Sequence, residues 1–294
     1  MTTDVKKAFV DYQTDFDVCE SIIKKHSKSF YAAFSQLPEE KAKSVYAIYA
    51  FCRLADDAID VQKDPELLQE LRSELTDFDQ GHIPNKPVWR ALSVVFHTFE
   101  MDITPFYDML SGQSMDIQFI QPESYEQLSR YCYYVAGSVG LMLLPILSTN
   151  SAAIQIPAKQ LGEAMQLTNI LRDIGEDFTD DRIYLPKKMM NQYHVSTADL
   201  ATHTLSTNFI QLWEDLAVKA ENLYLASLKM MPQIDKDCRQ ALLSALFIYR
   251  AQLTEIRKNN YDVFQGKTTI SNLKKIQLIK EVKKYLQELT LAEL

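Results

Sequence analysis

Two segments of the sequence carry polar side chains at a spacing that suits a metal site. The first is YAFCRLADDAID at 49–60. On a helix with about 3.6 residues per turn, Arg53, Asp56 and Asp60 fall within ~60° of one another, in line with Tyr49. The other faces of this segment are mainly apolar. A solvated surface face is the alternative, but such a face is usually wider and contains Lys or Gln.

The second segment is LGEAMQLTNILRDIGED, within a helix that we expect over 153–178. On a continuous helix, Gln166, Asp173 and Asp177 lie within ~40° of one another, and Asn169 lies ~60° from Gln166. Its remaining positions are again mostly apolar. Either segment alone could be accidental, because aspartates four residues apart are common. Two apolar helices with the same polar face indicate a shared site.

If the two polar faces meet, they offer only oxygen ligands. Oxygen ligands suit Mg²⁺, which binds through a few carboxylates and the phosphates of a substrate. The spacing does not match the calcium-binding loop of an EF-hand. The sequence therefore predicts a magnesium site, with these candidate ligands: Asp56, Asp60, Asn169, Asp173 and Asp177.

Basic and hydroxyl side chains near these faces would complete a phosphate site. Arg53 and Arg172 adjoin the candidate ligands, and KKHSKSF at 24–30 offers further donors, although a basic run is also common on a plain surface. No GxxxxGK[ST] or GxGxxG motif is present, so neither a nucleotide nor a dinucleotide has an evident cradle. A magnesium-bound diphosphate fits better. The donors in the basic segment are His26, Ser27, Lys28 and Ser29.

Composition and charge narrow the class of protein. The net charge of −8 argues against nucleic acid as a partner. The four cysteines lie far apart without a CxxC motif, which favours free thiols in a reducing compartment. The N-terminus lacks the apolar core of a signal peptide, so we expect a cytoplasmic protein. The charge-free stretch at 131–158 is interrupted by Pro145 and STNS, which favours a buried helix over a membrane span.

The whole chain is expected to form one all-α domain, 1–294. Apolar residues recur at helical spacing nearly throughout, and Gly is scarce at 7 residues. The last helix is amphipathic, which suits either packing on the core or a peripheral contact with a membrane surface. The expected helices cover 5–25, 39–60, 65–78, 87–98, 104–116, 124–147, 153–178, 205–230, 236–264 and 270–290.

A magnesium–diphosphate site at the mouth of an apolar bundle points to a prenyl diphosphate substrate. At these residues the sequence resembles the squalene/phytoene synthase family of head-to-head prenyl transferases. The resemblance covers nearly the whole chain. The five blocks that carry it are HSKSF (26–30), YAFCRLADDAID (49–60), YCYYVAGSVG (131–140), LGEAMQLTNILRDIGED (161–177) and RIYLP (182–186).

The resemblance implies a helical prenyl-synthase bundle around a central cavity, and it implies the reaction. One farnesyl diphosphate ionises, and its cation is attacked by the double bond of a second, which gives a cyclopropylcarbinyl diphosphate. This intermediate ionises again, rearranges and loses a proton. The implied catalytic residues are Arg53, Asp56, Asp60, Tyr131, Asp173 and Asp177. The implied substrate-binding residues are His26, Ser27, Lys28, Ser29, Tyr49, Arg53, Gln166, Asn169, Arg172 and Tyr249.

Within the family, the chain resembles most the bacterial branch that makes dehydrosqualene (4,4′-diapophytoene) for C30 carotenoids, which uses no NADPH. Phytoene synthase, with two C20 substrates, and NADPH-dependent squalene synthase are the enzymatic alternatives. A catalytically dead binding homologue is disfavoured because both acidic segments are intact. No obligate protein partner is evident. Phe34 and Tyr46 precede the metal-binding face, and bulky rings there would limit the cavity to C15 chains. The alternative is that both rings only pack between helices.

Overall fold

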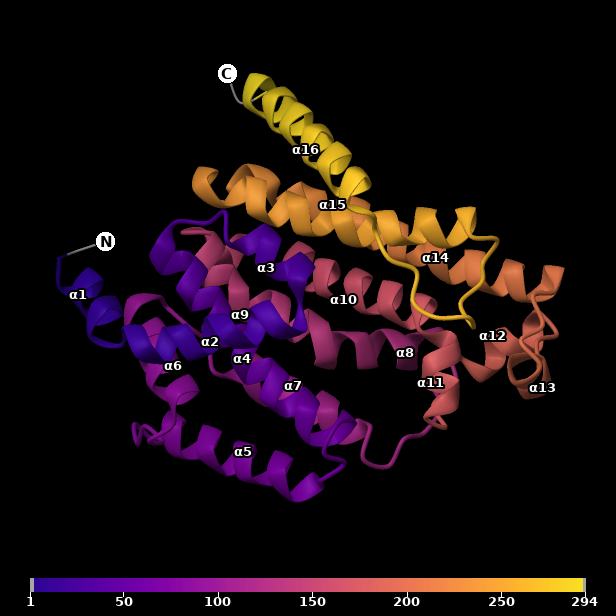
Figure 1. Cartoon of the computed structure of the whole chain (residues 1–294), viewed down its shortest axis with the longest axis horizontal. Coiled ribbons are helices and arrows are strands. Elements are labelled where there is room, and N and C mark those ends of the chain that lie inside the picture. Colours follow the sequence, from indigo (N-terminus) through magenta and orange to yellow (C-terminus); the bar gives the residue numbers. More distant parts are fainter. Residues whose placement is uncertain (1–2, 293–294) are drawn as a thin grey trace.

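The computed structural model describes residues 3–292, and this part of the chain is helical with no strand. Short turns and loops join the helices into one bundle (Figure 1). The helices are α1 (Thr3–Asp11), α2 (Gln13–His26), α3 (Lys28–Phe34), α4 (Glu39–Asp60), α5 (Pro65–Asp79), α6 (Pro87–Thr98), α7 (Thr104–Met115), α8 (Tyr125–Cys132), η1 (Tyr133–Gly137), α9 (Ser138–Leu147), η2 (Ser151–Ile154), α10 (Gln155–Arg172), α11 (Ile174–Thr179), α12 (Lys187–Gln192), α13 (Thr197–Ala201), α14 (Thr207–Ser227), η3 (Leu228–Gln233), α15 (Lys236–Lys258) and α16 (Asn272–Ala292).

The expected all-α class is confirmed, and α4, α5, α6 and α7 match their predicted ranges to within a residue. Other boundaries were wrong. The range 5–25 contains two helices that meet at Tyr12, and the range 236–264 ends as a helix at Lys258. The short helices α3, α12 and α13 were not predicted, because five to seven residues give too little periodicity to recognise.

Helices α4, α9 and α10 form the centre of the bundle. Helix α4 packs on α2, α6 and α9, while α10 packs on α9, α14 and α15. The large side chains that are fully buried include Phe51 on α4 and Trp213 on α14. Side chains of α3, α4, α7, η1, α9, α10, η3 and α15 line the cavity described below.

The charge-free stretch forms α8, η1 and α9 in direct succession. Its middle section, η1, is a π-helical turn, a feature that often occurs near functional sites. Residues Tyr125–Leu147 are long and apolar enough to cross a membrane by length and composition, which is weak evidence on its own. In the structure α9 packs against α4, α7 and α10, as expected for a central helix.

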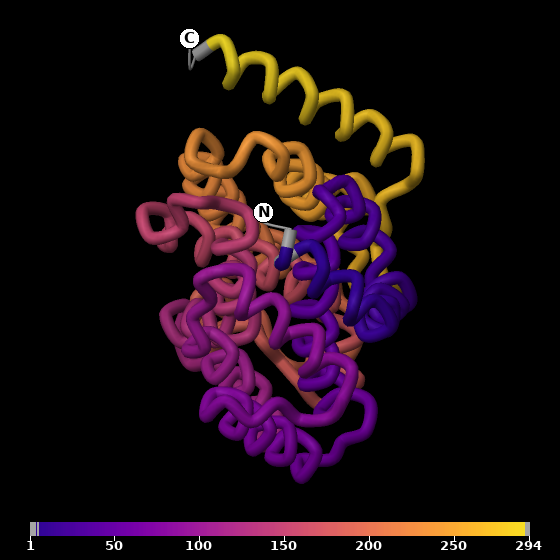
Figure 2. Tube along the Cα trace, turned by 90° about the vertical axis from the view of Figure 1, so that its left-hand side faces the viewer, coloured from indigo at the N-terminus to yellow at the C-terminus, as the bar shows by residue number. Residues whose placement is uncertain are grey.

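Helix α16 lies at the edge of the bundle and packs on α15 (Figure 2). Leu278 and Val282 are buried at this contact, and the ring of Tyr285 lies 6.3 Å from that of Phe247. Its outer side exposes Leu273 and Ile276. The amphipathic helix therefore uses its apolar face against the core, and a membrane contact of its outer side stays a prediction.

A glycine allows the close approach of α10 to η1. A Cβ atom on Gly162 would lie 2.1 Å from the carbonyl oxygen of Ala136, far inside van der Waals contact. Backbone rather than a flexible side chain blocks this space, so the two helices would have to move apart. Gly140 plays a similar part, since its Cβ would lie 2.5 Å from the carbonyl oxygen of Ala158.

We expect Gly162→Ala to destabilise the protein by about 3 kcal/mol, because overpacking a closed helix contact costs roughly that much. This loss corresponds to a fall in Tm of about 5–10 °C, measured by circular dichroism at 222 nm. Gln155→Ala, at an exposed position of the same helix, is the control and should change Tm by about 1–2 °C at most. Equal Tm values for both variants would contradict the close-packing interpretation.

Candidate active site

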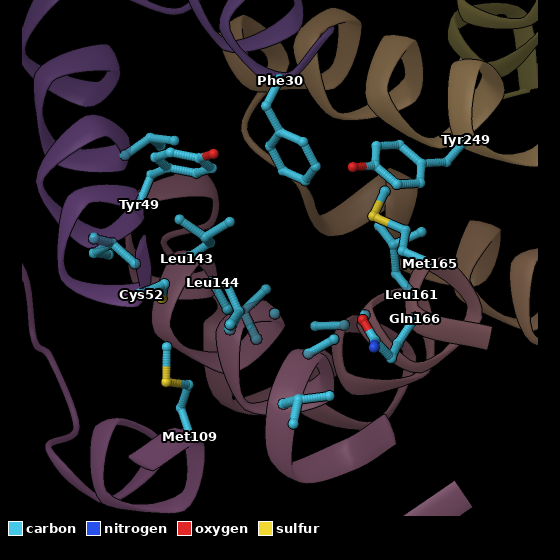
Figure 3. Close-up of a pocket in the computed structure, with 18 of the residues that line it drawn as sticks. Phe30, Tyr49, Cys52, Met109, Leu143, Leu144, Leu161, Met165, Gln166 and Tyr249 are labelled. Atoms are coloured by element: carbon cyan, nitrogen blue, oxygen red, sulfur yellow. The ribbon is translucent and has the colours of Figure 1, made fainter. Parts of the chain in front are cut away.

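A cavity of about 230 Å³ lies at the centre of the bundle. Tyr49 on α4 and Tyr249 on α15 face each other across it, with the ring of Phe30 between them (Figure 3). The ring of Phe30 lies 6.3 Å from that of Tyr49 and 5.3 Å from that of Tyr249. The rest of the wall is mostly aliphatic and includes Met109, Leu143, Leu144, Leu161 and Met165.

The polar side chains of the wall gather at one end. Arg53 and Asp56 lie near the end of α4, and Gln166 and Asn169 lie near the end of α10. The parts of α4 and α10 that precede them contribute mostly apolar side chains to the wall: Val45, Ile48, Tyr49, Cys52, Ala158, Leu161, Gly162 and Met165. The cavity is therefore an apolar chamber with one polar end, as the two polar faces predicted.

Arginine side chains neutralise three of the four predicted metal-binding aspartates. Arg53 bonds to Asp56 at 2.9 Å and also pairs with Asp57. Arg172 pairs with Asp173 at 2.5 Å, and its other nitrogen donates to Gln252 at 2.8 Å. These contacts place both predicted phosphate-binding arginines beside the carboxylates.

The third arginine is Arg182, which follows α11 and forms an ion pair with Asp60 at 2.7 Å. Asp60 does not line the apolar cavity. It lines a second cavity of about 300 Å³, together with Lys63, Asp116 and Arg182. Asp56 and Asp60 thus belong to one helix but to two neighbouring cavities.

The prediction of one continuous helix through Asp173 was wrong. Helix α10 ends at Arg172, and Asp177 lies on the separate helix α11. Two tertiary hydrogen bonds replace the helical bond that would join Gly175 to Leu171. The indole of Trp213 donates to the carbonyl of Leu171 at 3.0 Å, and the amide of Gly175 donates to the carbonyl of Val263 at 3.2 Å. The calculated alignment of Asp177 with Gln166 therefore does not hold.

Burial raises the pKa values of two of the carboxyl groups. Desolvation, followed by the charges of Asp173 and Glu176, raises the pKa of Asp177 to about 8. Desolvation, followed by the charge of Asp60, raises the pKa of Asp56 to about 6. In the described part of the chain, no arginine forms an ion pair with the carboxylate of Asp177, and the raised pKa favours its protonated form near neutral pH.

Two buried polar atoms at the polar end have no hydrogen-bond partner: Oδ1 of Asn169 and Nε of Arg53. A buried orphan oxygen among carboxylates suits a hard cation, and an orphan guanidinium nitrogen suits an anion. Within residues 3–292, no three Asp, Glu, His or Cys side chains converge tightly enough to hold an ion as they stand. The donor set fits Mg²⁺, which would compete with the arginines for these carboxylates.

The other predicted phosphate donors lie where α2 ends and α3 begins. His26 is the last residue of α2, and Lys28 and Ser29 begin α3. The hydroxyl of Ser27 caps α3 by accepting from the amide of Phe30 at 3.4 Å. None of the four lines the cavity, whereas Phe30, the next residue, does. Their contact with substrate stays a prediction.

Tyr131 also lies outside the lining of the apolar cavity. Its hydroxyl donates to Asp116 at 2.8 Å and lies 3.3 Å from the hydroxyl of Tyr184, which donates to the same carboxylate at 2.9 Å. Desolvation holds the pKa of Tyr131 well above its usual value. Tyr131 is thus joined, through Asp116, to the wall of the second cavity.

Sequence reasoning assigned no role to three residues that the structure places at the site. Gln113 lines the apolar cavity and donates to Asp56 at 3.3 Å, and Lys267 pairs with Glu176 at 2.7 Å. Arg182 is the third. Its RIYLP block was recognised, but the contact with Asp60 spans 122 residues and has no local signature.

Comparisons with known proteins agree with this geometry. Residues 23–274 match the squalene/phytoene synthase family. The chain is 36% identical over 279 residues to 4,4′-diapophytoene synthase of Staphylococcus haemolyticus, covering 92% of this chain and 97% of that protein. It is 32% identical over 281 residues to phytoene synthase of Arthrospira platensis, covering 90% and 91%. A crystal structure of a dehydrosqualene synthase in complex with a ligand is 58% identical, with a TM-score of 0.94 over 96% of this chain and 99% of that one.

The chain therefore belongs to the squalene/phytoene synthase family, whose members are prenyltransferase-type enzymes. The resemblance read from the five sequence blocks is confirmed, as is the helical prenyl-synthase bundle. Of the three proteins just described, the dehydrosqualene synthase of known structure shares the highest sequence identity with this chain, and the match covers nearly the full length of both chains.

We expect the raised pKa of Asp177 to make the metal-free protein less stable as pH rises. An exposed aspartate titrates near ~4, so the folded protein binds the proton more tightly than the unfolded chain does. The stabilisation is complete below about pH 4 and is lost as pH rises through about 8. Asp177→Asn should lose less Tm than the wild type between pH 6 and pH 9, by about 2–5 °C, in buffer with a chelator.

Asp180→Asn, an exposed site just after the same helix, is the matched control and should follow the wild-type curve. An Asp177→Asn variant with the wild-type pH dependence would show that Asp177 is ionised in the folded, metal-free protein.

Proposed function

We propose that the protein condenses two molecules of farnesyl diphosphate head to head into dehydrosqualene (4,4′-diapophytoene), a step of C30 carotenoid synthesis. The observation that carries this proposal is the 58% identity, over nearly the full length, to a dehydrosqualene synthase structure. The apolar chamber with one polar end supports it, because such a chamber suits an isoprenoid chain with a charged head group.

The walls of the cavity serve the carbocations of this reaction. The rings of Phe30, Tyr49 and Tyr249 lie around the cavity, and the face of an aromatic ring stabilises a nearby cation. The aliphatic wall excludes water, which would otherwise capture the cation as an alcohol. If the chamber takes up two chains, confining them together would favour bond formation between them.

The polar end holds the diphosphate groups. Bound Mg²⁺ would neutralise the charge that develops on a leaving diphosphate. Its proposed ligands are the side-chain oxygens of Asp56, Asp60, Asn169, Asp173 and Asp177. Arg53 and Arg172, once separated from their aspartates, bring guanidinium groups to the phosphate oxygens. His26, Ser27, Lys28, Ser29 and Gln166 are the further proposed head-group contacts.

The proposed pathway ends in loss of a proton, so it needs no NADPH. The product is a water-insoluble hydrocarbon, and we infer that a cytoplasmic enzyme with this product works close to the inner face of a membrane. The exposed Leu273 and Ile276 of α16, beside Lys280 and Lys284, are compatible with such a peripheral contact.

The purified protein is expected to convert farnesyl diphosphate to dehydrosqualene when Mg²⁺ is supplied, with the same rate and product whether or not NADPH is present. The hydrocarbon is identified by mass spectrometry after extraction. Asp56→Ala, which removes a proposed metal ligand, should lower turnover at least a hundredfold while the circular dichroism spectrum is retained. Squalene as the main product with NADPH would instead assign the protein to the squalene synthase branch.

Chain length is expected to depend on Phe34. Phe34, the last residue of α3, lines the cavity, and its ring lies 5.4 Å from that of Phe30. Tyr46 was predicted to share this role, but it is not among the lining residues, and its ring packs on Tyr31 at 5.7 Å. We therefore expect Phe34→Ala to open measurable turnover of geranylgeranyl diphosphate to phytoene while the C15 reaction continues.

Tyr46→Ala is the control, since it removes a similar ring from the same region without opening the lining directly. Products are compared after incubation with C15 and C20 diphosphates separately. Efficient phytoene synthesis by the wild type, or an unchanged C15-to-C20 ratio in Phe34→Ala, would contradict this role of Phe34.

A further inference from the structure

Arg182 connects the two acidic segments of the site. Its guanidinium nitrogen Nη1 lies 2.7 Å from Oδ1 of Asp60, at the end of α4. Its backbone amide donates to the carbonyl of Asp177, on α11, at 2.8 Å. One residue therefore contacts both segments, the carboxylate of Asp60 with its side chain and the backbone of Asp177 with its amide.

The backbone of Arg182 is fixed by the way α11 ends. Asp181 adopts a left-handed conformation with φ of 58°, and its amide donates to the carbonyl of Phe178 at 3.2 Å. Together with the Arg182–Asp177 bond, this is the hydrogen-bond pattern of a Schellman motif. Because the motif holds the backbone, Arg182 can leave Asp60 by rotating its side chain alone.

The side chain of Arg182 lies in the wall of the second cavity among several acids. Asp116, Asp180 and Asp181 line this cavity with Asp60, and Lys63 is the other cation there. Asp116 already accepts hydrogen bonds from Tyr131 and Tyr184. The side chain of Arg182 is 20% exposed and that of Asp60 is 43% exposed, so the pair is reachable from solvent.

The role of Arg182 differs from that of the other two arginines. Arg53 and Arg172 pair with aspartates one to four residues away on their own segments. Arg182 reaches Asp60 across 122 residues, so its ion pair also holds the two segments at a set separation. In this position the guanidinium group holds Oδ1 of Asp60, one of the oxygens that the proposed metal site could use.

We propose that Arg182 is a resident counter-cation of the metal site: it neutralises Asp60 and ties the two acidic segments together before Mg²⁺ and diphosphate bind, and it then turns from Asp60 to the diphosphate. This inference rests on the proposed function, because it needs Asp60 as a metal ligand. Arg182 would compete with Mg²⁺ for Asp60 when diphosphate is absent. When diphosphate is present, Arg182 would bind it together with Mg²⁺.

The test is calorimetric titration of the full-length protein with Mg²⁺, first alone and then in the presence of inorganic diphosphate. Arg182→Gln removes the competing charge, so its Kd for Mg²⁺ alone should fall about threefold to fivefold, as expected for a partly exposed ion pair. The tightening of Mg²⁺ binding by diphosphate should shrink in this variant, because the contact made in the ternary complex is lost.

Three further variants make the result specific. Lys63→Gln removes the other cation of the same cavity, which forms no ion pair with Asp60, and should change Kd for Mg²⁺ much less. Arg182→Lys keeps the charge and should bind Mg²⁺ with an affinity between those of the wild type and Arg182→Gln. In an Asp60→Asn background, Arg182→Gln should alter Mg²⁺ binding no further.

Unchanged or weaker binding of Mg²⁺ alone by Arg182→Gln would overturn the inference while leaving the metal site in place. The same tightening in Lys63→Gln would also overturn it, since the effect would then be one of general charge. Failure of the wild type to bind Mg²⁺, with or without diphosphate, would overturn the proposed metal dependence itself. If Arg182→Gln does not fold, the Kd of Arg182→Lys for Mg²⁺ is compared with that of the wild type in the same way.

Discussion

The site depends on holding several carboxyl groups close together in a wall that is poor in water. Desolvation of charge and mutual repulsion both oppose this arrangement, and together they can cost several kcal/mol. In the metal-free protein, three guanidinium groups and the protonation of one carboxyl group offset this unfavourable free energy. Arg53, Arg172 and Arg182 pair with three of the proposed ligands, and Asp177 holds a proton because its pKa is raised to about 8. Magnesium and diphosphate would exchange with these partners rather than enter an empty site.

Tertiary hydrogen bonds determine where the helices around the site are interrupted. Helix α10 breaks after Arg172 because Trp213 takes the carbonyl of Leu171 and Val263 takes the amide of Gly175. The break turns Asp177 onto a separate helix, and the end of that helix fixes the backbone of Arg182. Tertiary hydrogen bonds, rather than helix propensity, therefore position the second half of the site.

These interruptions mark the limit of what the sequence predicts. The polar face of α4 is correct from Tyr49 to Asp56, because that helix is unbroken from Glu39 to Asp60 and its periodicity gives the geometry directly, while Asp60 lines the second cavity. The face of α10 is correct as far as Asn169 and fails at Asp177, where partners distant in sequence decide the backbone. The sequence identifies Arg182 only as part of the RIYLP block, because only the folded chain brings Arg182 and Asp60 together.

The relation between the two cavities follows from the helical repeat of α4 and α7. Asp56 on α4 and Gln113 on α7 line the apolar cavity, whereas Asp60, one turn further along α4, and Asp116, directly after the end of α7, line the second cavity. The boundary between an apolar and a polar space therefore falls between successive turns of the same two helices. A molecule with an isoprenoid chain and a diphosphate head needs both spaces, in this order. Asp56 and Gln113 lie on the apolar side of this boundary, and Asp60 and Asp116 lie on the other side. A metal bound at the boundary could therefore hold the head group while the chain stays away from water.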